Sequence, residues 1–586
     1  MSAPTVLPLL AQVASAVADA IVRARPDMAG ADPVVRRSDR ADFQSNAALP
    51  LAKRAGEPPA RLAADLIDGL SGDEVIAEAL AAGPGFVNIT VADAALWAQV
   101  AARAADARLG VGEPATGSRI VIDYSAPNVA KEMHVGHLRT TIIGDALARV
   151  FGFLGGEVVR ANHLGDWGTQ FGMLIQYIDE HPEQRWHAAE VGADATVSVL
   201  DGLYKAARAE FDADPGFADR SRTRVVALQS GDVATLARWR EIVAESERAF
   251  GAIYDRLGVL LTPDDYAPES FYNPMLADTV TELLDKGVAT HSDGAIVVKS
   301  ERVNGPDGTP AVLMVRKGDG GYGYDTTDLA TIRYRISTLA ADRLLYVTDS
   351  RQALHFQLIF EAARRAGWLT GAVTVGHVAY GTILGPDGRP FKTRAGGTVR
   401  LTDLLDAAVA AARSVVAEKN PGLPAAELDT IAEQAGIGAV KYADLSTGRV
   451  KDYTFDPARM TAFNGNTGVY LQYAHARIRS ILRRAGDPGP APVDVTVPLD
   501  PAERALILTL DDYATVLEEV ARTLEPHRLA THLYELATVF TEFYATCPVL
   551  TAPEPLRDNR IAVCQLAART LAHGLGLLGI AAPARL

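Results

Sequence analysis

The sequence predicts a multidomain α/β protein with a doubly wound parallel sheet (Rossmann-like) in its central domain, an N-terminal α+β domain and a C-terminal all-α helical domain. The chain has 586 residues, which corresponds to about three to five domains at roughly 100–200 residues each. Strand-like segments at 119–122 and 157–160 enclose a helical pattern, the usual start of such a sheet. Beyond residue 424 the pattern is helical.

Changes in composition place the domain boundaries. Residues 1–112 are alanine-rich and helical with a strand-like segment at 85–90, and a turn-rich segment closes this unit. Residues 113–425 form the central domain, with a charged helical insertion at about 180–290. Further strand-like segments of the central domain are predicted at 174–177, 344–348 and 372–375.

The third predicted domain comprises residues 426–586. Its helices are interrupted by a proline-rich joint at 486–498. Apart from this joint, we expect the domain to be helical to its end.

The charge balance limits how the protein can bind nucleic acid. The formal net charge is −15, whereas non-specific binding needs a broad cationic surface that neutralises phosphates. Any RNA contact should therefore be local. The best candidate is the helical segment 475–484, and the alternative is a solvated basic face.

Cysteine usage and the N-terminal pattern indicate the compartment. Cys547 and Cys564 form neither a disulfide framework nor the spacing of a zinc site, so we expect a reducing compartment and no structural metal. Charged residues interrupt the apolar positions near the N-terminus, unlike a signal peptide or a membrane span. We expect a cytoplasmic protein with no membrane partner.

The most informative segment is His134-Val-Gly-His137, which follows the first strand of the sheet and opens a helix. Two imidazoles at a helix N-terminus can both face the phosphates of one nucleotide, where exposed N–H groups add partial positive charge. Gly136 leaves room for the base. A metal site or a pair of core histidines could use the same residues. An apolar stripe orients the helix: Leu138, Ile142, Ile143, Ala146, Leu147 and Val150.

A longer stretch, Asp123 to Asp145, resembles the first signature of class I aminoacyl-tRNA synthetases, and most closely that of arginyl-tRNA synthetase. Further matches to this family are far away in the chain, at 160–172, 391–394, 466–479 and the final residues 582–586. The resemblance therefore covers nearly the whole chain. It implies a class I catalytic domain between an additional N-terminal domain that contacts tRNA and a helical anticodon-binding domain.

The resemblance implies a two-step reaction. Arginine attacks the α-phosphate of ATP to give arginyl-adenylate, and the arginyl group then passes to the terminal ribose of tRNA(Arg). Alignment and stabilisation of developing negative charge should supply the acceleration, and His134 and His137 suit that role. Mg²⁺ should accompany ATP as part of the substrate complex. The family also implies that activation needs bound tRNA, and we expect a monomer.

The second class I signature is degenerate in this chain. Two lysines are usual for the class, whereas Pro390-Phe-Lys-Thr-Arg-Ala395 carries Lys392 and Arg394. By resemblance Lys392 binds ATP together with His134, Gly136 and His137. Lys131, three residues before His134, is the predicted substitute for the missing lysine. Its alternative is an ordinary solvated surface lysine.

Arginine selection requires acceptors, because a guanidinium carries five donors and no acceptor. Matching the family's motifs assigns an arginine pocket in which Asp328 accepts the guanidinium, Tyr324 covers its apolar neck and Asp123 is a second acceptor. Asn128 and Gln352 hold the α-amino and α-carboxylate groups. Some family members have Glu where Asp123 stands, so its shorter side chain reaches the guanidinium through water. Asp328 could instead belong to a helix cap, and Gln352 could be a surface amide.

Two segments are predicted to contact tRNA by resemblance. Aromatic and amide side chains near residue 42 suit stacking on splayed bases of the D-loop corner, although Phe43 could equally be a core residue. The predicted contacts are Phe43, Gln44, Asn46, Arg477, Arg479 and Arg483.

Two other functional classes remain open from the sequence. A small-molecule adenylyltransferase would share the nucleotide half but would leave both terminal domains without a role. A non-catalytic RNA-binding relative would not need His134, His137, Lys131, Asn128 and Asp328 together. Arginine-dependent pyrophosphate exchange with and without tRNA separates the three classes.

Overall fold

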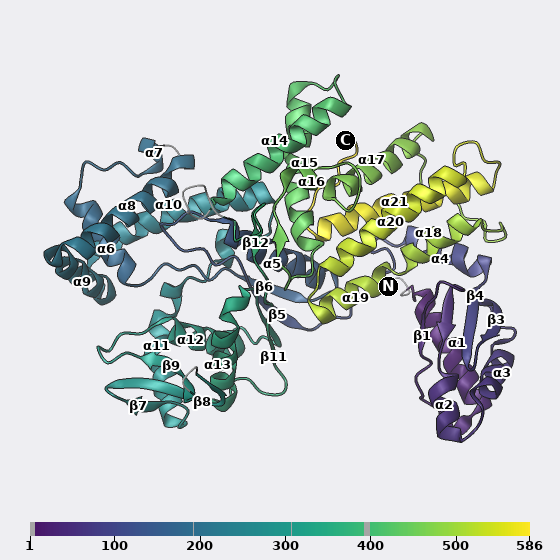
Figure 1. Cartoon of the computed structure of the whole chain (residues 1–586), viewed down its shortest axis with the longest axis horizontal. Coiled ribbons are helices and arrows are strands. Elements are labelled where there is room, and N and C mark those ends of the chain that lie inside the picture. Colours follow the sequence, from purple (N-terminus) through teal and green to yellow (C-terminus); the bar gives the residue numbers. More distant parts are fainter. Residues whose placement is uncertain (1–5, 192, 306–307, 392–398) are drawn as a thin grey trace.

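The computed structural model describes residues 6–191, 193–305, 308–391 and 399–586 and places the predicted sheet at the centre of the molecule (Figure 1). The sheet is parallel throughout, in the order β11–β10–β5–β6. Its strands are β5 (Arg119–Asp123), β6 (Glu157–Ala161), β10 (Arg343–Tyr346) and β11 (Thr374–His377). The predicted doubly wound parallel sheet is confirmed.

The winding of this sheet reverses between β5 and β10. The chain adds β6 on one side of β5 and later adds β10 and β11 on the other. At their carboxyl ends, Tyr346 and Ala161 both pair with Asp123. Parallel sheets bind ligands beyond the strand ends at such a switch point, so the residues that follow Asp123 stand where a site is expected.

Helix α5 (Val135–Phe153) packs tightly on the end of β5. Its predicted apolar stripe is buried from Leu138 to Val150. A Cβ on Gly144 would lie 2.3 Å from Cβ of Tyr124, so glycine permits this close approach. The packing holds the N-terminus of α5 at the carboxyl edge of the sheet. Helices α12 (Tyr324–Ser337) and α13 (Ala353–Arg365) belong to the second half of this domain.

A group of helices separates the two halves; its first helices project to the left in Figure 1, and its last one lies beside α12. It comprises α6 (Thr169–Glu180), α7 (Ala188–Val191), α8 (Ala193–Ala213), α9 (Pro215–Ser230), α10 (Val233–Leu257), the turn η2 (Pro263–Asp265) and α11 (Glu269–Asp285). The prediction of a strand at 174–177 is wrong, because these residues lie in α6. Phe171, Leu174, Ile175 and Ile178 are buried at helical spacing, a period that the short apolar run concealed.

An antiparallel sheet follows the insertion and was not predicted. Its strands are β7 (Thr290–Ser292), β8 (Ala295–Asn304) and β9 (Pro310–Arg316). In β9 the buried residues Ala311, Leu313 and Val315 alternate with exposed ones, so the period-two signal was present in the sequence. This sheet lies beside α12 and α13 at the lower left of Figure 1.

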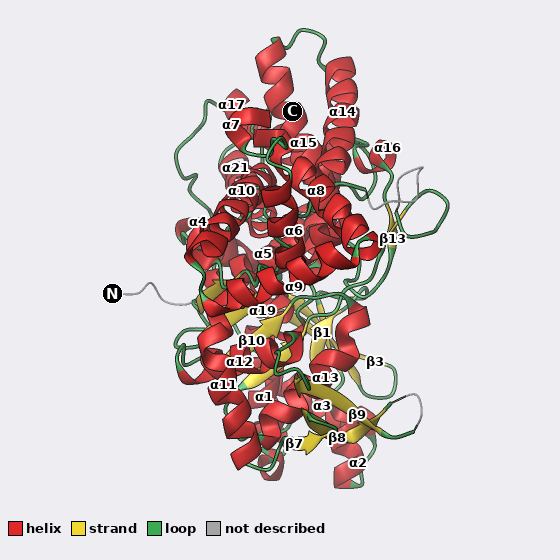
Figure 2. Ribbon diagram, turned by 90° about the vertical axis from the view of Figure 1, so that its left-hand side faces the viewer, coloured by secondary structure: helices red, strands yellow, loops and turns green. Residues whose placement is uncertain are grey.

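The C-terminal region is helical, as predicted, and Figure 2 shows α14, α15, α17 and α21 above the strand β10 of the central sheet. One short strand pair, β12 (Ile383–Leu384) with β13 (Tyr453–Thr454), joins this region to the central domain. The helices are α14 (Leu401–Lys419), α15 (Ala425–Leu445), α16 (Pro457–Met460), α17 (Gly468–Arg484), α18 (Pro501–Asp511), α19 (Tyr513–Thr523), α20 (His527–Thr546) and α21 (Leu556–Leu577).

The N-terminal domain is α+β, as predicted, with an antiparallel sheet in the order β1–β2–β4–β3. The sequence indicated one of these strands, because β1 and β2 are three residues long and β3 is alanine-rich and largely exposed. Its elements are α1 (Leu9–Ala24), the turn η1 (Pro26–Met28), β1 (Val35–Arg37), β2 (Phe43–Ser45), α2 (Ala48–Ala55), α3 (Pro59–Leu70), β3 (Ile76–Ala82), β4 (Phe86–Val91) and α4 (Asp93–Ala105).

Buried ion pairs fasten the N-terminal domain to the C-terminal helices. The Arg103 guanidinium of α4 donates to Asp511 of α18 at 2.7 Å, with both side chains buried. Arg504 of α18 pairs with Asp42 and Asp93.

None of the helices in the described part of the chain combines the length and apolar character that a membrane crossing needs.

Candidate active site

The two histidines of the predicted nucleotide site lie side by side at the N-terminus of α5, with ring centroids 4.0 Å apart. Nδ1 of His134 accepts the Gly136 backbone N–H at 3.0 Å, and Nδ1 of His137 accepts the His134 backbone N–H at 3.0 Å. Both imidazoles therefore cap their own helix. Each cap uses one ring nitrogen, so the other nitrogen is left for a ligand.

Both imidazoles are neutral near pH 7. Burial lowers the pKa of His137 to about 3, and the neighbouring His134 adds to the lowering. Burial also lowers the pKa of His134, with further contributions from Arg351 and Lys131. Because each Nδ1 accepts a hydrogen bond, the ring proton of the neutral form sits on Nε2. The pair thus offers two N–H donors rather than two positive charges.

The structure gives a second reason for glycine at position 136, in addition to the predicted room for a base. A Cβ at this position would lie 2.8 Å from Cε1 and 2.9 Å from Nδ1 of His134. A side chain would therefore displace the imidazole from its cap. The contact between Gly136 and an adenine base stays a prediction.

Backbone hydrogen bonds fix the residues on both sides of the second signature loop. Lys392 and Arg394 lie outside the described residues. On one side, the Phe391 N–H donates to Ile383 at 3.0 Å; on the other, the Val135 N–H donates to the carbonyl of Val399 at 3.0 Å. The Leu401 N–H continues this pairing by donating to Met133 at 2.9 Å. The residues after the loop are thus fastened beside the start of α5.

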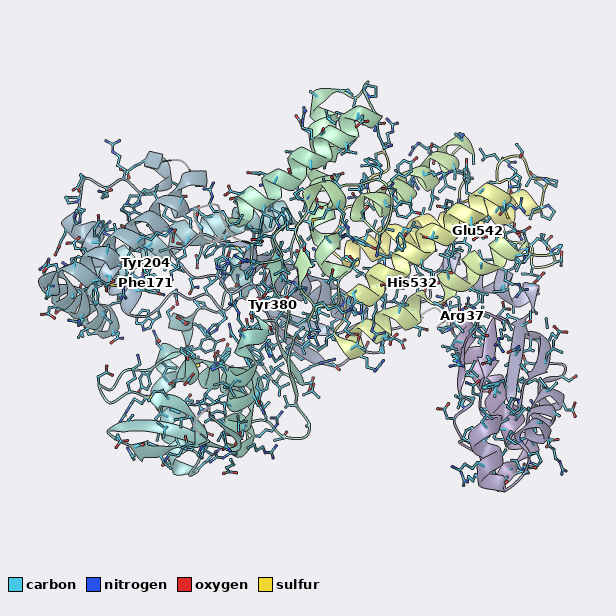
Figure 3. The ribbon with its side chains drawn as sticks, in the orientation of Figure 1. Arg37, Phe171, Tyr204, Tyr380, His532 and Glu542 are labelled. Carbon is cyan, nitrogen blue, oxygen red and sulfur yellow. The ribbon has the colours of Figure 1, made fainter. Side chains whose placement is uncertain are left out.

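Lys131 lies close to the paired imidazoles and contacts the insertion. Its Nζ is 4.7 Å from the ring centroid of Tyr204 on α8, a cation–π distance; Tyr204 is labelled in Figure 3, among the insertion helices. The charge of Lys131 contributes to the lowered pKa of His134, which indicates that the Lys131 ammonium lies near that ring. Lys131 is half-buried rather than freely solvated.

Asp328, the predicted guanidinium acceptor, lies on the first turns of α12. One of its carboxylate oxygens is 2.6 Å from Nε2 of His355 on α13. Tyr324 stands at the start of the same helix with its ring centroid 5.3 Å from that of His355, and its side chain is 68% exposed. The two helices thus gather Asp328, Tyr324 and His355 in one place.

Asp123, the predicted second acceptor, is already paired. Its carboxylate accepts a hydrogen bond from the Arg335 guanidinium at 2.6 Å, and the two side chains are 8% and 1% exposed. The guanidinium also lies 5.1 Å from the ring centroid of Tyr346. The ion pair ties the end of β5 to α12. The contact of Asp123 with the substrate guanidinium stays a prediction.

The remaining two pocket residues are exposed at the carboxyl edge of the sheet. Gln352 ends the single turn η3 (Ser350–Gln352) before α13, and its side chain is solvent-exposed. The charge of the neighbouring Arg351 lowers the pKa of His134, which indicates that this turn lies close to the imidazole pair. Asn128 lines a cavity of about 540 Å³ that opens beside it. The cavity walls include Trp167, Tyr204, Arg208, Phe211 and Glu269.

Comparison with known proteins identifies this arrangement. Residues 103–457 match the model of the class I tRNA synthetase (R) catalytic domain, residues 11–91 match the arginyl-tRNA synthetase N-terminal domain, and residues 471–586 match the DALR anticodon-binding domain. The chain belongs to the class I arginyl-tRNA synthetases.

Close relatives support this assignment over the full length. The arginine–tRNA ligase of Frankia casuarinae is 67% identical over 589 residues, which cover 100% of both chains. That of Streptomyces avermitilis is 51% identical over 99% of this chain and 100% of its own. The arginyl-tRNA synthetase structure from Plasmodium falciparum has a TM-score of 0.82 at 27% identity and covers 100% of both chains. The predicted family membership and fold are confirmed.

The pocket contains one residue that no motif in the sequence marks. Glu269, at the first position of α11, lines the cavity next to Asn128. Burial raises its pKa to about 7, with further contributions from the negative charges of Asp166 and Asp328. A carboxylate in the first turn of a helix is ordinary in sequence. Its proximity to Asp328 comes from the packing of α11 against α12.

The predicted tRNA contacts in the N-terminal domain are mostly buried. Phe43 is 1% exposed in the core, the alternative that the sequence left open, so its ring cannot stack on a base in this position. The Gln44 amide is 7% exposed and donates to Asn88 at 2.7 Å. Asn46 is half-exposed, but its side-chain oxygen is buried and has no hydrogen-bond partner in the described part of the chain. The predicted contact thus rests on Asn46.

The basic residues of α17 face outward. Arg477 is exposed and lies 4.6 Å above the ring centroid of Tyr544 on α20. Arg479 is half-exposed, and Arg483 donates to the carbonyl of Ala584 at 3.1 Å. The three guanidinium groups lie on the helical domain, and their contact with tRNA stays a prediction.

Proposed function

We propose that the chain activates L-arginine with ATP to form arginyl-adenylate and transfers the arginyl group to the 3′-terminal ribose of tRNA(Arg), with activation dependent on bound tRNA. One observation carries this proposal. Asp328, which suits a guanidinium, lies in the first turns of α12, and the paired N–H donors of His134 and His137, which suit phosphates, lie at the start of α5 after the carboxyl end of β5. Such a layout places an amino acid against a nucleotide.

The guanidinium would lie between Asp328 and Glu269. Both carboxylates face the same region, since the charge of Asp328 contributes to the raised pKa of Glu269. Two acceptors match the planar fork of donors on arginine and leave the ammonium of lysine with fewer bonds. Tyr324 would cover the apolar stem, and Asn128 and Gln352 would hold the α-amino and α-carboxylate groups. Asp123 supports this pocket by holding Arg335.

The substrate supplies the nucleophile for activation. The arginine carboxylate forms a bond to the α-phosphorus while the bond to the pyrophosphate oxygen breaks, so no protein nucleophile takes part. The Nε2–H groups of His134 and His137 would donate to phosphate oxygens as negative charge develops there. Lys131, together with Lys392 and Arg394, would balance the charge of the departing pyrophosphate. Mg²⁺ would arrive with ATP and bridge its phosphate oxygens.

The other parts of the chain would position tRNA. We assign residues 1–112 to the domain that contacts the tRNA corner through Asn46, 113–425 to catalysis and 426–586 to anticodon binding, where Arg477, Arg479 and Arg483 would meet phosphates. Because the net charge is −15, these contacts would be confined to such local cations. We further propose a cytoplasmic monomer.

Arginine-dependent pyrophosphate exchange tests the proposal. Exchange of labelled pyrophosphate into ATP should require arginine, ATP and tRNA(Arg) together, and charged tRNA should accumulate when pyrophosphate is omitted. Exchange without tRNA would argue for the simpler adenylyltransferase. Binding of tRNA without exchange under any condition would indicate a non-catalytic relative.

A further inference from the structure

His355 is a charged residue of the arginine pocket that the reaction described above does not use. It lies on the first turn of α13, three residues after Gln352, and its side chain is 18% exposed. Nε2 is 2.6 Å from one oxygen of Asp328, and Nδ1 is 3.4 Å from an oxygen of Asp325. A single imidazole therefore bridges two carboxylates of α12.

The far carboxylate is fixed independently of His355. Asp325 accepts the backbone N–H of Met314 on β9 at 2.8 Å through its other oxygen, and it is 8% exposed. A continuous series of contacts thus runs from β9 through Asp325 and the His355 imidazole to Asp328. The rings of Tyr324 and Phe356, each with a centroid 5.3 Å from that of His355, restrict its rotation.

The imidazole that reaches Asp328 carries a positive charge. Burial alone would lower the pKa of His355, but hydrogen bonds to Asp325 and Asp328 and the charges of both carboxylates outweigh burial and raise the pKa to about 9. In its charged form both ring nitrogens donate. Without this cation, two nearby carboxylates would repel each other, and one would take up a proton or turn away.

We infer that His355 is a positioning residue for arginine recognition, which holds one oxygen of Asp328 so that the other oxygen faces the substrate guanidinium. This inference rests on the proposed role of Asp328. No other described residue hydrogen-bonds the Asp328 carboxylate. A carboxylate anchored at one oxygen has lost its freedom to rotate, so less rotational entropy is lost when the guanidinium binds.

The geometry also gives His355 a part in selectivity. His355 offsets the charge of one of the two α12 carboxylates, so the Asp325–His355–Asp328 group carries one net negative charge. The free Asp328 oxygen and Glu269 then present two separate acceptors, which the planar fork of a guanidinium can meet better than a compact ammonium. His355 thereby favours a planar cation over a compact one.

The decisive comparison is His355→Phe against His355→Gln. Phenylalanine keeps a ring between Tyr324 and Phe356 but removes both donors, and glutamine returns a donor near the position of Nε2. Pyrophosphate exchange with saturating tRNA(Arg) gives KM for arginine, KM for ATP and kcat. We expect His355→Phe to raise the arginine KM at least tenfold, with the ATP KM within twofold and kcat within threefold of the parent. We expect His355→Gln to recover the arginine KM to within threefold.

His291→Phe and His291→Gln, made on the exposed histidine of β7, control for loss of a histidine. An arginine KM within twofold of the parent in His355→Phe would overturn the inference. An equal rise of both KM values, or a glutamine variant no better than phenylalanine, would do the same. If His355→Phe does not fold, Asp325→Asn decides, because it weakens the hold on the imidazole: a selective rise in arginine KM supports the inference and an unchanged one overturns it. Arginine- and tRNA-dependent exchange by the parent keeps the proposed function standing in either case.

Discussion

The two ends of the active site meet opposite substrate charges in different ways. At the phosphate end, His134 and His137 are neutral, their Nδ1 atoms are bound to the backbone of α5, and their pKa values are lowered by burial. At the arginine end, Asp328 and Asp123 are each held by a cationic partner, His355 or Arg335. Neutral imidazoles can lie with their ring centroids 4.0 Å apart without repelling each other, whereas carboxylates packed together need cations between them.

This contrast shows how each end of the site stabilises its binding groups before the substrate binds. At the phosphate end the imidazole pair and the helix terminus offer neutral, polar donors, and positive charge comes separately from Lys131. The arginine end keeps real charges but compensates them inside the protein. Substitutions at the arginine end should therefore affect stability as well as binding, while those at the phosphate end should affect mainly the rate.

The largest expected effect comes from breaking the buried pair at the arginine end. Asp123→Asn leaves the Arg335 guanidinium buried without its anion, which should reduce stability by about 3–5 kcal/mol. Urea unfolding followed by circular dichroism measures this loss. Glu157→Gln, which removes an exposed ion pair at the other end of β6, should leave the unfolding midpoint nearly unchanged. A stable Asp123→Asn protein with a raised arginine KM would return Asp123 to the predicted role of substrate acceptor.

Next in size is the loss of a cation at the phosphate end. Lys131→Ala should cost about 2.7–4 kcal/mol of transition-state stabilisation, or roughly 10²–10³ in the rate of activation, because a preorganised donor to the pyrophosphate is lost. Single-turnover adenylate formation with tRNA present measures it. Transfer from preformed adenylate should change much less, and Lys205→Ala, on the exposed face of α8, should be silent. Equal losses in both steps would make Lys131 a structural residue.

Asp328→Asn removes the negative charge of this side chain at the arginine end but nearly keeps its shape. Losing the charge opposite a guanidinium should weaken arginine binding by about 2 kcal/mol, the lower part of the range for a buried charged pair, because Asp328 is 20% exposed. The arginine KM should rise while the ATP KM stays the same. Asp278→Asn, on the exposed face of α11, is the matched control. An unchanged arginine KM in a folded protein would exclude Asp328 from the pocket.

His137→Asn tests the neutral donor while keeping the cap. The asparagine oxygen can accept the His134 N–H in place of Nδ1, but the donor at Nε2 is lost. A hydrogen bond to a charged group contributes about 1.5–3 kcal/mol, so activation should slow roughly tenfold or more with ATP affinity nearly unchanged. Rapid-quench activation measures the step, and His291→Asn serves as the control. Activation at the parent rate would show that His137 only caps α5.

The smallest effect is a pH dependence confined to the arginine end. Glu269, with a pKa of about 7, must be ionised to accept a guanidinium, so binding releases a proton below that pH. The arginine KM should therefore fall roughly tenfold from pH 6 to pH 8, as the ionised fraction rises. Glu269→Gln should remove this dependence. The ATP KM should change much less, because burial lowers the pKa of both His134 and His137 below that of a free imidazole; a parallel change in both KM values would contradict the assignment.

Much of the architecture followed from sequence periodicity and from motifs. The apolar stripe from Leu138 to Val150 predicted α5 because one face of that helix must be buried. The strand-like segments predicted the parallel sheet for the same reason, and His134 and His137 marked its nucleotide edge. The segment Leu174-Ile-Gln-Tyr177 misled because such a short, mainly apolar run fits a strand and a buried helix turn equally well.

Only the tertiary structure decided how the charged residues pair. Asp123 and Arg335, or Asp328 and His355, are brought together by packing of α12 and α13 against the sheet, and no spacing in the chain encodes those contacts. The same packing makes Glu269 a pocket residue and Phe43 a core residue. The sequence by itself determined which residue types could bind arginine and ATP. Long-range packing determined which of them face the substrate, because burial and neighbouring charge depend on distance in space rather than distance along the chain.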